Sequence, residues 1–573
     1  MTERSRSVAL IAQLRDPVAK HLLARFCVST RWNYQVRTVD PEAVAVGAAL
    51  HDEHIDGLLA SCLGLDLEGC DADSAVRWAL RQAKLPYKHG GFGDVPALHV
   101  RYAAYYASYA LVASHIFELY ADVGCLPGSE SPVTFGAETT SVSLEDLLLQ
   151  RVEAFDSRRP HLLPLSYFTC YTTYRTYAGA LKKALTDLGE SELPADVRGD
   201  IPTPILHCIL ARRHVVDAAI EHGIGDASAD TPTLPPLDFQ TVTAKAQKIA
   251  ADILKQVEFR VLRSAAVAAR AGDVVARLDD CSSFGAGAFL NAIPRGRERS
   301  GRYSLRPDLW VIAARAHIGL TPPGVVPGDI CGLCHRPLDS GVEGQGVCCG
   351  SLSGSCSRAA IHASVCPIGG FKNRRHNSTA DVLCEMWEAI GGTAAADHRK
   401  ARNSRGVDVV GNTCTLPSGN QVDLILYGAG RHGGDIAIDV SFVCVEASNS
   451  KFETAIAKRE ADKNTKYLEE CKSLGLEFYP FVLGAHGGFG KSARSLFKVL
   501  VGLAKKLEAR DWRHSWTAMS YEACWLQKLS IVIARESAIG ALCRVPVFTR
   551  NVVLGEDAGG DWTVGRSGGG VER

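Results

Sequence analysis

The spacing of apolar residues divides the chain into a long helical part and a shorter part that mixes helices and strands. In the first helical segment Leu10, Leu14 and Val18 recur every four residues, which is typical of one face of an α-helix. A glycine-rich loop interrupts the second segment at 85–93, and prolines break 121–240 into short pieces. The predicted helical segments are 1–70, 74–120, 241–278 and 307–320.

From residue 378 onward, apolar runs of strand length alternate with amphipathic helices. The predicted order is helix, strand, strand, strand, helix, strand and helix. This pattern predicts an α/β core with a central mixed sheet, so the whole chain is expected to be a multidomain α + α/β protein. The predicted helices are 379–390, 452–473 and 492–507, and the predicted strands are 407–410, 421–427, 436–443 and 477–484, of which the first is weak.

The composition is that of a folded chain without a membrane span. The 573 residues include 63 Lys+Arg and 63 Asp+Glu, so any basic surface must be local. The first twenty residues are charged and lack a sustained apolar run, which argues against a secretory signal. No uncharged apolar run reaches about 18 residues, the length that a membrane span needs. The 19 cysteines are therefore expected in a reducing compartment, as thiols or as metal ligands.

A Cys-x2-Cys pair and a His-x3-Cys pair together predict a zinc site. Each pair lets two side chains reach one ion from a short turn or helix, and four protein ligands would make the site structural. The alternative is free thiols in a loop. His317 and His335, near these pairs, are interpreted as ordinary polar residues. The predicted ligands are Cys331, Cys334, His362 and Cys366, and Cys348, Cys349 and Cys356 between the pairs could compete for the third and fourth positions.

Two aspartates, Asp423 and Asp439, each lie inside a predicted apolar strand. A buried carboxylate without a partner costs several kcal/mol, and a Mg²⁺ or Mn²⁺ ion would remove that cost. Lys463 and Lys466 lie one turn apart on the helix 452–473, and either could orient water or stabilise charge on a phosphate. In the alternative interpretation each aspartate faces solvent or pairs with an arginine, and the lysines form a solvated helix face.

Two basic segments are candidate nucleic-acid contacts, because arginine side chains pair well with phosphate groups. One segment precedes the predicted zinc site and the other follows it. The alternative for the first segment is a solvated loop, and the second segment could help to position a metal ion. The candidate residues are Arg295, Arg297, Arg299 and Arg302 in the first segment, and Arg374, Arg375, His376 and Asn377 in the second.

Several motifs resemble the C-terminal part of non-LTR retrotransposon reverse transcriptases. The R-x-N-Y-x-x-R-T motif from Arg31 and the L-P-x-x-x-G-G-F-G loop from Leu85 are similar to the thumb that follows the polymerase palm. The S-x-x-G-A-G-A motif from Ser282 is similar to the segment before the zinc knuckle of that family, and the Cys/His pairs resemble the knuckle. The basic-His-Asn sequence at 375–377 resembles a motif upstream of the family's nuclease core.

The core around the two aspartates resembles the PD-(D/E)xK restriction-like endonuclease of the same family. Asp423 falls on the first aspartate of the family pattern, although Val422 replaces the proline. Asp439 falls on the second acidic position, but Ser441 replaces the usual lysine. The resemblance implies that a basic residue from the next helix takes over the role of that lysine.

The resemblance implies a metal-dependent DNA endonuclease module that nicks target DNA to prime reverse transcription in the nucleus. Target DNA would be its substrate, and retrotransposon RNA and a polymerase-bearing chain would be further partners. The palm motif is absent, because the only Asp-Asp pair, Asp279-Asp280, lies in a helical run, so this chain alone is not expected to polymerise. The alternative function is a non-catalytic DNA- or RNA-binding remnant, which could bind RNA through the knuckle and 295–306.

These interpretations divide the chain into consecutive segments. The expected segments are a thumb-like helical region at 1–125, a helical linker region at 126–280, a basic and helical segment at 281–330, the zinc knuckle at 331–370, the restriction-like endonuclease at 371–510, and a C-terminal extension at 511–573 whose end, 561–573, is expected to be disordered.

Overall fold

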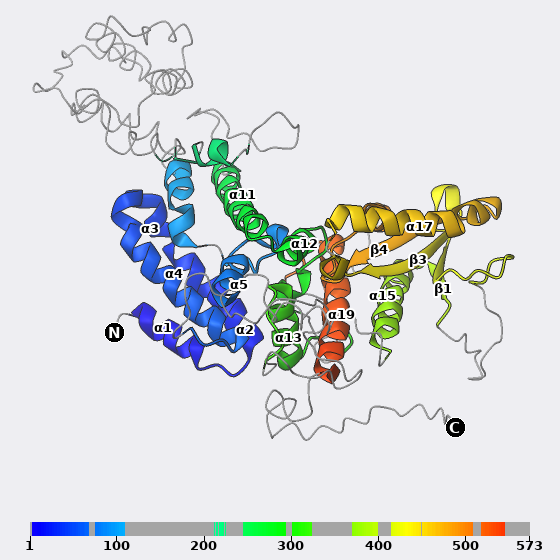
Figure 1. The fold of residues 1–573 in the computed structure, drawn as a ribbon, viewed down its shortest axis with the longest axis horizontal. Coiled ribbons are helices and arrows are strands. Elements are labelled where there is room, and N and C mark those ends of the chain that lie inside the picture. The colour runs from blue at the N-terminus through cyan, green and yellow to red at the C-terminus, as the bar shows by residue number, and fades with distance from the viewer. Residues whose placement is uncertain are drawn as a thin grey trace, which may run out of the picture.

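The described part of the chain is mostly helical and contains one four-stranded mixed sheet, as the α + α/β expectation requires (Figure 1). None of its helices is long and apolar enough to cross a membrane. The computed structural model describes residues 3–67, 75–94, 96–108, most of 211–224, and 245–293, 301–323, 370–398, 414–448, 450–507 and 517–544.

The N-terminal helices begin and end where local sequence signals predict. The side chains of Asp16 and Asp40 accept hydrogen bonds from the first free amides of α2 and α4, and a proline follows each of them. Gly64 ends α4 in the left-handed conformation that glycine adopts without strain. The helices of this region are α1 (Glu3–Ala12), α2 (Pro17–Leu23), α3 (Asn33–Thr38), α4 (Pro41–Leu63) and α5 (Ala75–Ala83).

The glycine-rich loop at 85–93 packs into the helical body. A Cβ on Gly91 would lie 1.9 Å from the backbone oxygen of Leu85, so no other residue fits there. The adjacent Phe92 is fully buried and donates its backbone N–H to Ala83 O over 2.7 Å. This loop therefore contributes directly to the core of the N-terminal helices.

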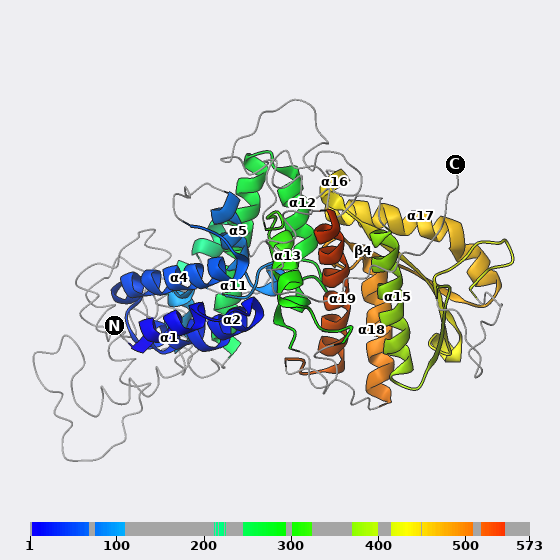
Figure 2. The ribbon, with the colours of Figure 1, turned by 90° about the horizontal axis from the view of Figure 1, so that it is seen from below.

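A long C-terminal helix, α19 (Tyr521–Arg544), joins the helical body to the sheet. Trp525 and Leu529 pack into the core of the sheet, whereas Ala538 and Leu542 pack into the core of the N-terminal helices. A helix that is apolar on more than one face belongs in an interior, and Figure 2 shows α19 between the two parts. The other helices of the junction are α11 (Lys245–Ala268), α12 (Gly272–Cys281) and α13 (Pro307–His317).

The sheet has the strand order β1-β2-β3-β4, with antiparallel pairing from β1 to β3 and parallel pairing of β3 with β4. Helix α17 makes the crossover that a parallel pair requires and covers one face, while α15 and α18 cover the other (Figures 1 and 2). The elements are α15 (Phe371–Glu388), β1 (Thr393–Ala396), β2 (Leu424–Tyr427), β3 (Ile436–Val443), α17 (Phe452–Ser473), β4 (Glu477–Gly484) and α18 (Lys491–Lys506).

The predicted boundaries of β3, α17 and β4 coincide with the observed ones, and the structure adds a strand that was not predicted. This strand, β1, follows the turn at Gly391 and Gly392. Its three consecutive alanines carry no alternation of polar and apolar residues, so the sequence pattern does not predict it. The expected weak strand at 407–410 lies outside the described residues. Trp387 ties α15 to the sheet by donating its indole N–H to Tyr427 O over 3.1 Å.

Candidate functional site

Asp423, directly before β2, and Asp439, within β3, lie across from each other on the two paired strands. Leu424 of β2 is opposite Ile438 of β3, so one further step in the antiparallel register sets Asp423 opposite Asp439. Side chains alternate between the faces of a sheet, and the positions two residues away, Ile425 and Ala437, pack together in the core beneath α17. The alternation therefore directs both carboxylates towards the α17 face.

Asp439 is buried and paired with a lysine from α17. Only 3% of the residue is exposed, and Lys463 Nζ lies 2.7 Å from its Oδ2. Burial raises the pKa of Asp439, the charge of Asp423 raises it further, and hydrogen bonds from Lys463 and Tyr467 oppose the rise. A second positive charge near this carboxylate would consequently be stabilising.

Asp423 is held by the basic-His-Asn segment at the start of α15. Its Oδ2 lies 2.9 Å from His376 Nε2 and accepts a hydrogen bond from Val440 N over 2.6 Å. The other ring nitrogen of His376 lies 3.0 Å from Asn377 Oδ1, which fixes the ring. Burial disfavours the charged form of His376, but the hydrogen bond and charge of Asp423 outweigh it and raise the pKa of His376. Both contacts use Oδ2, so Oδ1 can take a further ligand.

Helix α17 supplies two cations to β3, of which the sequence analysis identified one. Lys463 contacts Asp439, and Arg459, four residues earlier on the same helix face, donates its Nε–H to Ser441 Oγ over 2.8 Å. Ser441 occupies the position of the lysine in the restriction-like pattern. Lys466 donates instead to Tyr467 OH over 2.8 Å. The four-residue spacing from Lys463 was the signal that could have revealed Arg459.

An open cleft of about 520 Å³ lies over this group. The start of α15 forms one wall, α17 forms another, and the end of β3 lies at the bottom. Positive side chains predominate in its lining, which suits a polyanion such as a nucleic-acid backbone. The charged residues that line it are Lys372, Arg375, His376, Asp397, His398, Arg459 and Lys463.

The two remaining arginine candidates of the described part form contacts within the chain. Arg302 lies 2.6 Å from Glu385 Oε1 and 3.0 Å from Asp381 Oδ2, so its guanidinium holds the segment before α13 against α15. Arg374 pairs with Glu536 of α19 over 3.1 Å. The other predicted basic residues and all predicted zinc ligands lie outside the described residues, namely Arg295, Arg297, Arg299, Cys331, Cys334, His362 and Cys366.

The donor atoms at Asp423 and Asp439 fit a hard divalent cation. Magnesium prefers carboxylate oxygens and usually needs only one or two of them from the protein, with water and substrate phosphate completing the shell. Both carboxylates face the same side of the sheet, and Val440, whose amide donates to Asp423 Oδ2, lines the neighbouring cleft. The residues present can therefore hold Mg²⁺ or Mn²⁺ through these two side chains.

Neither the comparison with protein-family models nor the comparison with curated proteins found a match. The assignment of a function accordingly depends on the chemistry of the residues in the cleft.

Proposed function

We propose that this chain is the metal-dependent endonuclease module of a non-LTR retrotransposon protein, and that it nicks target DNA to prime reverse transcription. The observation that carries the proposal is that two carboxylates from neighbouring strands, Asp423 and Asp439, meet a lysine from the crossover helix next to a basic cleft that the same lysine lines. The helix and strand order around this group is the one that the resemblance to restriction-like endonucleases implies.

Each side chain has a distinct role in hydrolysis. Asp423 and Asp439 would hold Mg²⁺ or Mn²⁺, which when bound polarises the scissile phosphate and lowers the pKa of water. The Lys463 ammonium opposes the rise in the pKa of Asp439 and can donate to an oxygen that gains negative charge. His376 orients Asp423, and Arg459 and Lys372 are placed to contact phosphates on either wall.

The proposal extends to parts of the chain that the structure does not describe. The predicted zinc knuckle of Cys331, Cys334, His362 and Cys366 would add a structural zinc, and the retrotransposon RNA and a polymerase-bearing chain would be further partners. A nuclear location follows from the same resemblance. These features remain predictions, since they rest on sequence motifs alone.

The direct test is nicking of a supercoiled plasmid pool that carries random inserts, so that a specific target sequence is represented. With Mg²⁺ the unsubstituted chain should nick, and Asp423→Asn and Asp439→Asn should each reduce the rate by at least about 100-fold, since a catalytic ion stabilises the transition state by several kcal/mol. Asp462→Asn is the control, because Asp462 is an exposed residue next to Lys463 on α17.

Two results would count against the proposal. Equal rates for all variants would show that the aspartates bind no catalytic ion. DNA binding without any nicking by the unsubstituted chain would instead favour the non-catalytic DNA- or RNA-binding remnant.

A further inference from the structure

Three potential metal ligands from distant parts of the sequence converge where the helical body meets the sheet. Cys281 ends α12, His317 ends α13, and His486 lies in the turn after β4. One donor atom of each residue lies within 4.8 Å of the other two. Cys281 and His317 are buried, and the His486 side chain is 9% exposed. The group shares no residue with the cleft or with the predicted knuckle.

The spacing of two donors matches that of ligands around one ion. The distance from Cys281 Sγ to His317 Nδ1 is 3.6 Å. In a tetrahedral zinc site with bonds of about 2.3 Å to sulfur and about 2.1 Å to nitrogen, two such ligands lie about 3.6 Å apart. We propose that Cys281, His317 and His486 bind a single zinc ion, which fastens the helical body to the sheet.

The surroundings of His486 suit this role. His486 Nε2 lies 3.2 Å from Glu446 Oε2, which leaves Nδ1 as its free ligand atom. A carboxylate behind a histidine is the usual partner of a metal-bound imidazole. The Cys281 thiol and the His486 ring, which is charged in the ion pair with Glu446, would each release a proton when they bind the ion.

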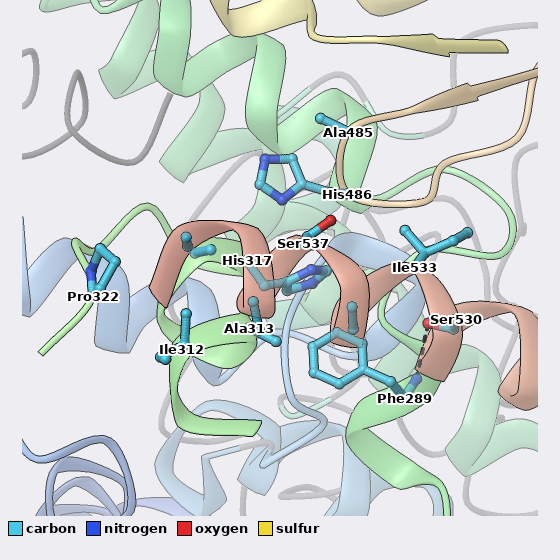
Figure 3. Close-up of a pocket in the computed structure, with 14 residues that line it drawn as sticks. Phe289, Ile312, Ala313, His317, Pro322, Ala485, His486, Ser530, Ile533 and Ser537 are labelled. Atoms are coloured by element: carbon cyan, nitrogen blue, oxygen red, sulfur yellow. Dashed lines mark hydrogen bonds between the residues drawn. The ribbon is translucent and has the colours of Figure 1, made fainter. Parts of the chain in front are cut away.

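A small cavity provides room for a fourth ligand. His317 and His486 line a space of about 50 Å³ together with Phe289 and Ser537, and Figure 3 shows both imidazoles at this space from separate segments. A water molecule fits this space, because it needs only about 15 Å³ of volume that the centre of a water-sized sphere can occupy. A nucleotide does not fit, so we assign the ion a structural role and no reaction.

Two glycines let the backbone pack closely against Cys281 and His317. A Cβ on Gly90 would lie 2.9 Å from Cys281 Cβ, and one on Gly287 would lie 3.2 Å from His317 Cε1. Asp280 accepts hydrogen bonds from the amides of His486 and Gly488, each over 3.0 Å, which fixes the turn that carries the third ligand. Close packing against Cys281 and His317, and the hydrogen bonds to the turn of His486, thus restrict the positions of all three residues.

The same atoms could also form a metal-free network. Cys281 Sγ lies 3.2 Å from His317 O and can donate its proton there, while His486 and Glu446 form an ion pair. The two states differ in whether the thiol keeps its proton and whether the protein retains a metal, so both can be distinguished by measurement.

The first test uses the full chain with Cys331→Ser and Cys334→Ser, so that the predicted knuckle does not contribute. After expression with zinc and dialysis, we expect one zinc per chain, and X-ray absorption at the zinc edge should show one sulfur and three nitrogen or oxygen neighbours. Absence of retained zinc, or a shell with two or more sulfurs, would overturn the proposal. This measurement needs no substitution at the site itself.

The second test compares Cys281→Ser and His486→Gln with Cys471→Ser, which removes another fully buried free cysteine. In the same background, the first two should lose the zinc and lower the melting temperature, whereas the control should keep one zinc per chain. Retention of zinc by folded Cys281→Ser, verified by circular dichroism, would contradict the assignment. The endonuclease proposal is unaffected by either outcome.

Discussion

Lys463 Nζ of α17 lies 2.7 Å from Oδ2 of Asp439 on β3, where only 3% of the aspartate is exposed. The crossover geometry produces this pair, because α17 leaves the end of β3 and returns across the sheet before β4 begins. A buried carboxylate needs a positive partner, and the lysine provides one without a bound metal. The same lysine then lies beside the position where a phosphate would react.

Replacing Lys463 should impair nicking far more than replacing Lys466. We expect Lys463→Ala to reduce the Mg²⁺-dependent nicking rate by about 100-fold or more, as removal of one well-placed donor to a transition state does. Lys466→Ala should stay within about threefold, because its ammonium contacts Tyr467 OH and not an aspartate. Single-turnover nicking rates on an intact DNA duplex that contains the site cut in the plasmid assay would measure both effects. A larger loss in Lys466→Ala would show that the wrong lysine has been assigned.

The Lys463–Asp439 pair also makes a prediction about stability. Lys463→Met leaves the Asp439 charge buried without its partner, which should cost about 3–5 kcal/mol in unfolding free energy. Asp439→Asn removes the charge and should cost less. Denaturant titrations in EDTA would compare the two variants.

Magnesium should restore part of the stability lost in Lys463→Met, since an ion at Asp423 and Asp439 would replace the missing cation. Asp439→Asn should show no such gain. If Mg²⁺ leaves the midpoint of Lys463→Met unchanged at millimolar concentration, these carboxylates do not form a metal site.

The contact between His376 and Asp423 predicts a pH-dependent contribution to stability. The folded pKa of His376 is raised above the unfolded value of about 6.5, so the native state binds more protons between the two values. The stabilisation is therefore complete below about pH 6.5 and is lost as the pH rises through the folded value. His376→Gln keeps a hydrogen-bond donor but loses the charge, so it should be most destabilising in acid.

Unfolding free energies at about pH 5.5 and about pH 8.5 would measure this difference. His54→Gln is the control, because His54 is exposed on α4. A destabilisation by His376→Gln that is equal at both pH values would mean that the ring is neutral in the folded protein throughout.

Replacing Lys372 should weaken DNA binding, whereas replacing Arg302 should lower the stability of the fold. Lys372 is exposed at the wall of the cleft, so Lys372→Ala should reduce the slope of log affinity against log salt by about one. Arg302 binds Glu385 and Asp381, so Arg302→Ala should leave that slope unchanged and cost about 2 kcal/mol in unfolding free energy. A change in the salt slope of Arg302→Ala would restore its predicted role as a phosphate contact.

The turn after β4 should not tolerate a side chain at Gly488. A Cβ there would lie 2.5 Å from Asp280 Oδ1, which accepts the Gly488 amide, so Gly488→Ala should destabilise the fold by about 1–3 kcal/mol. The control is Gly502→Ala in α18, where no atom lies within 4 Å and alanine should stabilise the helix by about 0.5–1 kcal/mol. Melting temperatures that fall in both variants would refute the explanation by a local clash.

Local patterns in the sequence were sufficient to locate β3, α17 and β4. Glycines mark the turns around these elements, with Gly434 before β3, Gly475 between α17 and β4, and Gly484 at the end of β4. Periodicity and turn chemistry therefore define the boundaries without reference to the rest of the chain. An aspartate inside an apolar strand is likewise visible in sequence, because burial of a carboxylate is costly anywhere. For this reason the sequence predicts that Asp423 and Asp439, which lie on consecutive strands, come close together.

Only the tertiary structure decided which side chains meet across elements. The choice of Lys463 over Lys466, the contact of Arg459 with Ser441, and the ion pairs of Arg302 all depend on how helices settle against the sheet. The convergence of the three ligands at the junction joins residues that are far apart in sequence and carry no shared spacing. Periodicity records which face of an element is buried, whereas packing alone determines what that face contacts.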